Sequence, residues 1–232
     1  MKTPILLTII CFLCLSLSAQ TKSYVWNISG TSIMKSPSQN SETLETIELG
    51  QELTSRLTDG ESFETIQASN SGYPLHGEWL PIKSEDQTGY VFSGDLSVNE
   101  PPVIDVEGFL KVDLDQIMGE KQSDSVQIKT IQVGASKFDV EVQTTFYEHG
   151  FYSYQASDSC FDHTYHFNDL SFIEVFHLAM SMYCLQVDDQ VILPGFFEEQ
   201  EGEIHFWGNE ATVEVILWED ENGWQLASYD CT

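Results

Sequence analysis

Between positions 44 and 96 the chain consists of short apolar runs that glycine and proline interrupt at close intervals. Runs of this length are too short for helices, and alternation of apolar with polar residues is typical of a half-buried strand. Ile47, Leu49 and Leu53 alternate with polar residues in this way, with Gly50 among them. This stretch therefore predicts a small β module with tight turns.

Two later glycines in the same stretch predict further turns. Trp79 and Leu80 begin a strand after Gly77, and Gly89 permits a turn that a side chain would hinder before Tyr90 resumes the strand. The stretch indicates a module, and no residue in it indicates a reaction.

The order of these segments resembles the bacterial SH3 (SH3b) family over residues 24–98. The matching segments are an arm with a turn before Pro-Ser at 32–38, hydrophobic-x-hydrophobic-x-x-Gly at 44–50, a Trp strand at 78–82, Gly-Tyr-Val at 89–91, and a final short Leu strand at 95–96. The resemblance implies a small β-barrel that recognises a peptide or a cell-wall peptide. Trp79 and Tyr90 are then the candidate groove aromatics, although Trp79 suits the core equally well.

The chain departs from the family pattern at two places. Ile33-Met34-Lys35 stands where the family usually has Asn-Val-Arg, and residues 59–76 are longer than the usual hairpin. Any groove bounded by that segment is therefore expected to differ from the family's groove.

Residues 1–19 have the features of a secretory signal peptide. Lys2 precedes an apolar run at 4–17, and Ser18-Ala19 offers a small-residue cleavage site. A membrane anchor is the alternative; a lipoprotein at Cys14 is disfavoured because Phe12-Leu13 precede it. We expect an exported protein, periplasmic or extracellular, with no further apolar run long enough to span a bilayer.

The acidic composition disfavours several classes of partner. The chain has 37 acidic and 9 basic residues, and its formal net charge is −28. Nucleic-acid binding depends on cationic contacts to phosphate, so it is disfavoured, as are anionic wall polymers and anionic lipid surfaces. The charge favours solubility or a salt-rich habitat; Ca²⁺ binding or capture of a basic protein are the sharper alternatives.

Pro101-Pro102 marks a predicted boundary between domains at 20–100 and 103–232, because two prolines stiffen the chain and exclude helix. The second domain carries 25 of the acidic residues and 4 basic ones. Its sequence matches no family pattern that we recognise.

The pattern of the second domain predicts an α+β fold, in which an antiparallel sheet covers one apolar helix. Alternating runs at 126–133 and 138–146 predict a hairpin with one face in water, and runs at 212–218 and 224–229 flank an Asn-Gly turn. Shorter strands are expected at 151–154, 191–193 and 203–207. The whole chain is accordingly predicted to be mainly β.

One helix is expected at 172–184. Ser171 and Glu174 have capping-box spacing, and the following residues leave little polar face, so the helix should be largely buried. His177 on this helix is interpreted as a packed core residue rather than a ligand.

Three cysteines remain once Cys11 and Cys14 leave with the signal peptide. Three thiols in an exported chain favour one disulfide and one spare thiol. Cys160 and Cys231 lie in polar segments and are predicted to pair, while Cys184 suits a buried free thiol in the apolar helix.

The residues around Cys160 suggest two kinds of reactive site. Cys160, His163 and His166 have a Cys-x-x-His-x-x-His spacing that could hold Zn²⁺, with His149, His205 or Asp162 as the fourth ligand; a polar loop is the favoured interpretation. A cysteine hydrolase of the NlpC/P60 type would use Cys160 with His205 as base, but the required Asp-Cys-Ser-Gly-like motif is missing.

The sequence thus favours an exported, non-catalytic binding protein without a cofactor. Its SH3b-like module would recognise a peptide or cell-wall peptide. The alternatives are a cysteine-dependent cell-wall hydrolase and an acidic inhibitor or immunity-type protein that captures a basic partner.

Overall fold

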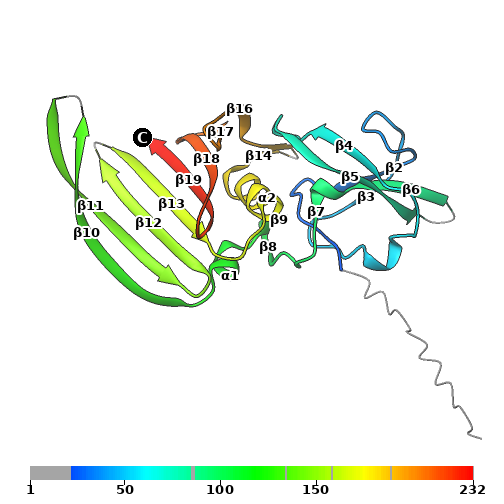
Figure 1. Cartoon of the computed structure of the whole chain (residues 1–232), viewed down its shortest axis with the longest axis horizontal. Helices are drawn as coiled ribbons and strands as arrows, with labels where there is room; N and C mark the ends of the chain where they lie inside the picture. Colours follow the sequence, from blue (N-terminus) through cyan, green and yellow to red (C-terminus); the bar gives the residue numbers. More distant parts are fainter. Residues whose placement is uncertain (1–21, 85–86, 134, 158, 189, 232) are drawn as a thin grey trace, which may run out of the picture.

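The computed structural model describes residues 22–84, 87–133, 135–157, 159–188 and 190–231. The predicted signal peptide at 1–19 therefore lies outside the described residues. The chain forms two parts that lie side by side, with helix α2 (Phe172–Tyr183) between them (Figure 1). Strands dominate both parts, as the sequence predicts.

The N-terminal part is built on a five-stranded antiparallel sheet. Its strands run in the order β3 (Thr43–Ile47), β2 (Thr31–Met34), β6 (Gln87–Phe92), β5 (Pro74–Ser84) and β4 (Phe63–Ala68). The pair β1 (Tyr24–Val25) and β7 (Leu96–Ser97) and two short 3-10 helices, η1 (Thr54–Arg56) and η2 (Ser93–Asp95), complete this part. The closed SH3b-like barrel stays a prediction.

The alternating apolar residues of this part are buried, but they do not form one strand. Ile47, Leu49 and Leu53 are buried, although β3 ends at Ile47. Gly50 has a φ of +83°, a conformation that turns the chain and that other residues rarely adopt. Leu53 reaches the same core from the loop after this turn.

The turns predicted at Gly77 and Gly89 are wrong, because both glycines lie inside strands. A Cβ at Gly89 would come within 2.5 Å of Ile33 Cγ2, and one at Gly77 within 2.7 Å of the Phe92 ring. The missing side chain therefore serves a close approach of neighbouring groups and not a reversal of the chain.

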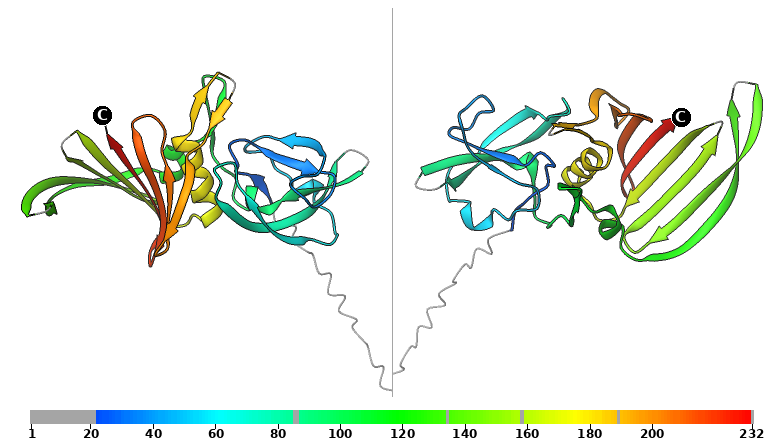
Figure 2. Two further views of the ribbon diagram at one scale, coloured as in Figure 1. Left: turned by 90° about the horizontal axis from the view of Figure 1, so that it is seen from above. Right: turned by 180° about the vertical axis from the view of Figure 1, so that it is seen from behind.

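The C-terminal part is built on an eight-stranded antiparallel sheet (Figures 1 and 2). Its strands run in the order β10 (Lys121–Val133), β11 (Ser136–Tyr147), β12 (Gly150–Ser157), β13 (Cys160–Phe167), β19 (Gly223–Cys231), β18 (Thr212–Asp220), β17 (Glu203–Trp207) and β16 (Gly195–Gln200). Both predicted hairpins are confirmed, as β10–β11 and β18–β19.

Helix α2 covers one half of one sheet face, which we call the helix face; the opposite face is the outer face. The helix-face residues under α2 are fully or almost fully buried: Ile204, Phe206, Val215, Leu217 and Leu226. The buried helix and its capping box are confirmed, since Ser171 N donates to Glu174 Oε2 over 2.7 Å.

The hairpin β10–β11 lies beyond the cover of this helix, and the strand register places the apolar residues of β11 on the outer face. The sequence predicts that the apolar residues of β11 form a buried face, but Phe138 and Phe146 are exposed and only Val140 is buried. Periodicity shows that the residues share one face, and it does not show whether another element covers that face.

Smaller elements surround α2. They are the hairpin β8 (Val103–Val106) and β9 (Phe109–Val112), the short helix α1 (Leu114–Met118), and the hairpin β14 (Leu185–Val187) and β15 (Gln190–Ile192). In the described part of the chain, no helix is both long enough and apolar enough to cross a membrane.

The two parts share one hydrophobic core across the predicted boundary. Pro101-Pro102 do lie between β7 and β8. The ring of Tyr73, from the N-terminal part, nevertheless lies 5.8 Å from the rings of Phe172 and Phe176 and 5.2 Å from that of Phe196. The backbone N–H of Phe196 also donates to the carbonyl of Ser71 over 2.8 Å.

Candidate functional site

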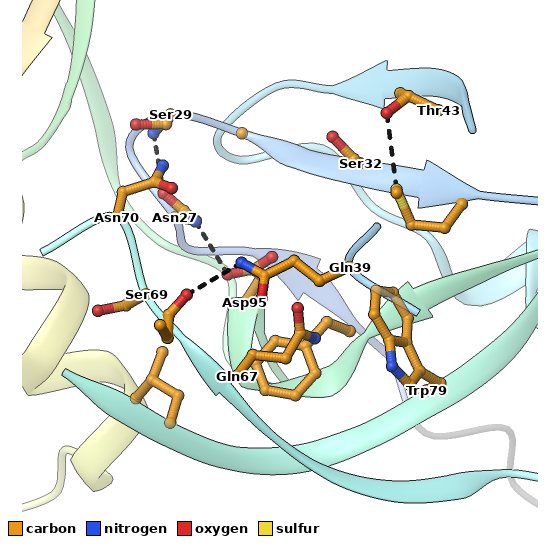
Figure 3. Close-up of a pocket in the computed structure, with 15 residues that line it drawn as sticks. Asn27, Ser29, Ser32, Gln39, Thr43, Gln67, Ser69, Asn70, Trp79 and Asp95 are labelled. Carbon is orange, nitrogen blue, oxygen red and sulfur yellow. Dashed lines mark hydrogen bonds between the residues drawn. The ribbon is translucent and has the colours of Figure 1, made fainter. Parts of the chain in front are cut away.

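A cavity of about 270 Å³ opens in the N-terminal part, beside the sheet (Figure 3). Four large apolar side chains belong to its lining: Met34, Leu75, Trp79 and Phe92. The remaining lining is polar and comes from loops and strand ends, and it includes Asn27, Gln39, Gln67, Asn70 and Asp95. The cavity thus combines an apolar surface with converging polar groups, which is typical of a binding site.

Asp95 is the charged group of this cavity, and two side chains fix its carboxylate. Asn27 Nδ2 donates to Oδ1 over 2.9 Å, and Thr31 Oγ1 donates to Oδ2 over 2.7 Å. Each carboxylate oxygen can accept more than one hydrogen bond, so the group can still take a donor from a ligand. Its position at the C-terminal end of η2 holds it against the cavity.

Burial raises the pKa of Asp95, and the neighbouring His177 and the bonds from Thr31 and Asn27 oppose that rise. Burial likewise lowers the pKa of His177, against the opposing charge of Asp95. His177 comes from α2 and its Nε2 lies 2.8 Å from the carbonyl oxygen of Gly94. The cavity is therefore linked through Asp95 to the helix of the C-terminal part.

Gln67 supplies a hydrogen-bond donor without a partner. The residue is 9% exposed, and its Nε2 has no hydrogen-bond partner among the described residues. A buried donor left unpaired costs about 1–3 kcal/mol, so such a group in a cavity wall favours a ligand with an acceptor oxygen. Gln39 Nε2, in contrast, already donates to the carbonyl of Ala68.

The structure separates the two aromatics proposed for the groove. Trp79 borders the cavity, but it is 4% exposed and packs on Phe92 with ring centroids 5.9 Å apart. Tyr90 does not line the cavity; its ring packs on Phe63 at 6.0 Å. Trp79 thus serves as both core residue and cavity wall, and Tyr90 belongs to a neighbouring surface.

The predicted disulfide between Cys160 and Cys231 is present, with Cα atoms 4.2 Å apart. The two residues lie directly opposite each other in the β13–β19 pair. Among the described cysteines Cys184 is the free one, as predicted, but it is half-buried at the end of α2 rather than enclosed. Burial raises the pKa of its thiol, which disfavours the reactive thiolate.

Cys160, His163 and His166 do not converge on a metal. Cys160 is oxidised, and the alternation of strand β13 places His163 on the helix face and His166 on the outer face. Tyr152 OH lies 2.8 Å from Nδ1 of His163, and Asn168 Oδ1 lies 3.0 Å from Nε2 of His166. Within the described ranges, no group of three His, Cys, Asp or Glu residues is arranged to hold a metal ion.

The residues weighed for a cysteine hydrolase do not assemble either. The sulfur of Cys160 is bonded to Cys231 and cannot act as a nucleophile in this state. His205 lies on β17, three strands from β13 in the sheet order, or about 14 Å at the usual strand spacing. Its Nδ1 is instead 2.7 Å from Glu214 Oε1.

No family model matches this chain, and no curated protein or solved structure matches it either. The resemblance to the SH3b family therefore stays a prediction from sequence order.

Sequence reasoning missed Gln67 and Asp95. In the sequence, Gln67 alternates within an ordinary strand pattern, and Asp95 is only part of the short terminal segment of the module. They come together because β4, η2 and the loop before β2 meet at one end of the sheet.

Proposed function

We propose that this chain is an exported, non-catalytic binding protein whose N-terminal part holds a peptide or cell-wall peptide in the cavity beside Trp79. The observation that carries this proposal is the unpaired Gln67 amide in a cavity that also contains the Asp95 carboxylate. A peptide group offers one carbonyl acceptor and one N–H donor, and these two side chains supply the complementary groups.

The cavity lining suits a short polar segment better than a large apolar ligand. The apolar side chains lie together, while amides, hydroxyls and one carboxylate line the rest. A ligand with an ammonium group near Asp95 gains from the acidic character of the chain, since opposite charges attract. Stem peptides of bacterial cell walls and other short peptides offer both kinds of group.

The proposal includes an SH3b-like barrel for the N-terminal part. The strand order β3-β2-β6-β5-β4, together with the β1–β7 pair, supports this interpretation, as does the order of the sequence motifs. The long β4–β5 hairpin, which the sequence marks as the departure from the family, contributes Gln67 to the cavity.

The test is calorimetric titration of the chain from residue 20 onward with a soluble muropeptide and with its stem peptide alone. Gln67→Leu removes one donor, so we expect the dissociation constant to rise about 2- to 10-fold, the range for one hydrogen bond of about 0.5–1.5 kcal/mol. Gln87→Leu is the matched control, because Gln87 is exposed on β6 and does not line the cavity.

Equal binding by the Gln67→Leu and Gln87→Leu variants would remove the cavity from the proposal. If the wild-type chain binds neither the muropeptide nor the stem peptide, recognition of cell-wall peptides is ruled out. Circular dichroism of each variant verifies that the fold is retained.

A further inference from the structure

Strand β10 is the outer edge of the eight-stranded sheet, and it has a strand neighbour on one side only in the described structure. It is 13 residues long. Figures 1 and 2 place it at the end of the molecule farthest from the N-terminal part, with no element beyond it. Its outward backbone N–H and C=O groups therefore face open space, where another strand can pair with them.

This edge also exposes apolar side chains. Val126 and Ile128 are 60% and 67% exposed, and they point to the same face because they are two residues apart. Edge strands of monomers are usually protected by proline, lysine, bulges or short length. β10 is long and contains no proline; its register shift lies at the far end between Lys121 and Ser123, and Lys129 points to the opposite face from Val126.

The distribution of charge favours a second copy of the chain as the partner of β10, because the β10–β11 hairpin is a neutral region on an otherwise acidic molecule. With a net charge of −28, two copies repel each other over most of their surface. Residues 121–147, which form the β10–β11 hairpin, contain three lysines and three acidic residues and are neutral. The opposite edge, β16, carries Glu198 and Glu199 without a basic residue. A basic partner has no electrostatic reason to select the neutral edge.

We propose that β10 pairs in antiparallel fashion with β10 of a second copy and joins the two sheets into one. The two-fold axis passes through Gln127, so that Val126 of one copy lies opposite Ile128 of the other, and the reverse. The four β-branched side chains then cover one another, which is a favourable cross-strand arrangement.

The side-chain pattern selects this register. Opposed residues in an antiparallel pair point to the same face, so moving the two-fold axis by one residue shifts every residue's partner by two. An axis through Val126 would place Asp124 opposite Ile128, a carboxylate against an exposed apolar side chain. An axis through Ile128 would leave Val126 opposite Thr130, whose hydroxyl already donates to Asp139. Only the axis through Gln127 matches both apolar residues.

Sedimentation equilibrium of the full exported chain tests the association. We expect a dimer, and we expect Val126→Lys combined with Ile128→Lys to raise its dissociation constant at least tenfold. The matched control is Val98→Lys combined with Val187→Lys, since these valines are also exposed but lie outside the large sheet. Because all four side chains are exposed, melting curves should show that each variant keeps its fold.

Cross-linking tests the register in a Cys184→Ser background, which leaves the Cys160–Cys231 disulfide intact. Gln127→Cys should give a covalent dimer on non-reducing gels, because the two thiols meet at the axis. Lys129→Cys should not, because the two thiols lie about 13 Å apart along the strands. The proposal is overturned if the chain is a monomer at all concentrations, or if Val126→Lys combined with Ile128→Lys leaves the dimer unchanged. The register is overturned if position 129 gives a cross-link and position 127 does not. These outcomes are independent of peptide binding in the distant cavity.

Discussion

His177 is one of two titratable residues of α2 that connect the two parts of the molecule; the other is Glu174. His177 is buried, and its Nε2 faces the carbonyl of Gly94 across the junction. The interpretation of this residue as a packed core histidine is confirmed. A buried imidazole with a lowered pKa resists protonation, so the folded state takes up its proton only at a lower pH than the unfolded chain does.

Stability should therefore fall as the pH drops below the unfolded histidine pKa of about 6.5. The unfolded chain binds the proton first, and one such group lowers the free energy of unfolding by up to about 1.4 kcal/mol per pH unit until the folded state is also protonated. His177→Gln retains an N–H donor for the Gly94 carbonyl. In this variant the free energy of unfolding should depend less steeply on pH, because the buried imidazole is gone. Urea unfolding between pH 7 and pH 5 measures this dependence.

The exposed His76 on β5 provides the control, because His76→Gln changes a histidine of the N-terminal part without touching the junction. If the free energy of unfolding of His177→Gln falls between pH 7 and pH 5 as steeply as that of the wild type, the buried imidazole does not cause the loss of stability in acid.

At the scale of elements, the capping box of α2 has a second role. Glu174 is completely buried, and its Oε1 accepts hydrogen bonds from Ser97 Oγ over 2.6 Å and Asn99 Nδ2 over 2.8 Å. Its Oε2 accepts from the backbone N–H and the hydroxyl of Ser171. A buried carboxylate is tolerated when its lone pairs are used in this way. The same side chain therefore begins the helix and fastens it to the N-terminal part.

The disulfide acts on another pair of elements, since it joins the first residue of β13 to the last residue of β19. The two cysteines are 71 residues apart in the sequence, and the chain-entropy treatment gives about 4 kcal/mol for a loop of that length. Cys160→Ser combined with Cys231→Ser should lower the free energy of unfolding by about this amount.

Chemical denaturation of the double variant, without reductant, measures the change. The reduced wild-type chain should show the same loss, and Cys184→Ser should show little. A double variant as stable as the wild type would mean that the sheet pairing alone fixes these two strands.

At the scale of the whole molecule, the dominant features are the shared core and the charge. Tyr73 packs among Phe172, Phe176, Phe196 and Phe206, so neither part buries its apolar surface alone. The acidic residues are concentrated in the C-terminal part, and no Lys or Arg follows Lys137. Mutual repulsion of these charges opposes the compact state.

Added NaCl should therefore raise the melting temperature by several degrees. The Debye length falls from about 10 Å at 0.1 M to about 3 Å at 1 M, so salt screens the repulsion. Ca²⁺ at matched ionic strength should give no further large gain, because no loop has the ligand spacing of a calcium site. Melting temperatures measured in NaCl and in Ca²⁺ at matched ionic strength test both expectations. A rise of many degrees with sub-millimolar Ca²⁺ alone would make the acidic loops a metal site.

Features that depend on neighbours along the chain could be predicted from the amino-acid sequence. Alternation predicted the β10–β11 and β18–β19 hairpins, and the Ser171 and Glu174 spacing predicted where α2 begins. These features follow from periods of two residues in a strand and 3.6 in a helix, which are local. The polar surroundings of Cys160 and Cys231 were enough to predict their bond.

Which surfaces meet, in contrast, became visible in the folded molecule alone. Phe138 and Val215 both alternate with polar residues, yet Phe138 is exposed and Val215 is buried, because the strand register places Phe138 on the outer face and Val215 on the helix face under α2. Gln67, Trp79 and Asp95 border one cavity because the fold brings β4, β5 and η2 together there. Such contacts depend on the burial of residues distant in sequence, which no local pattern contains.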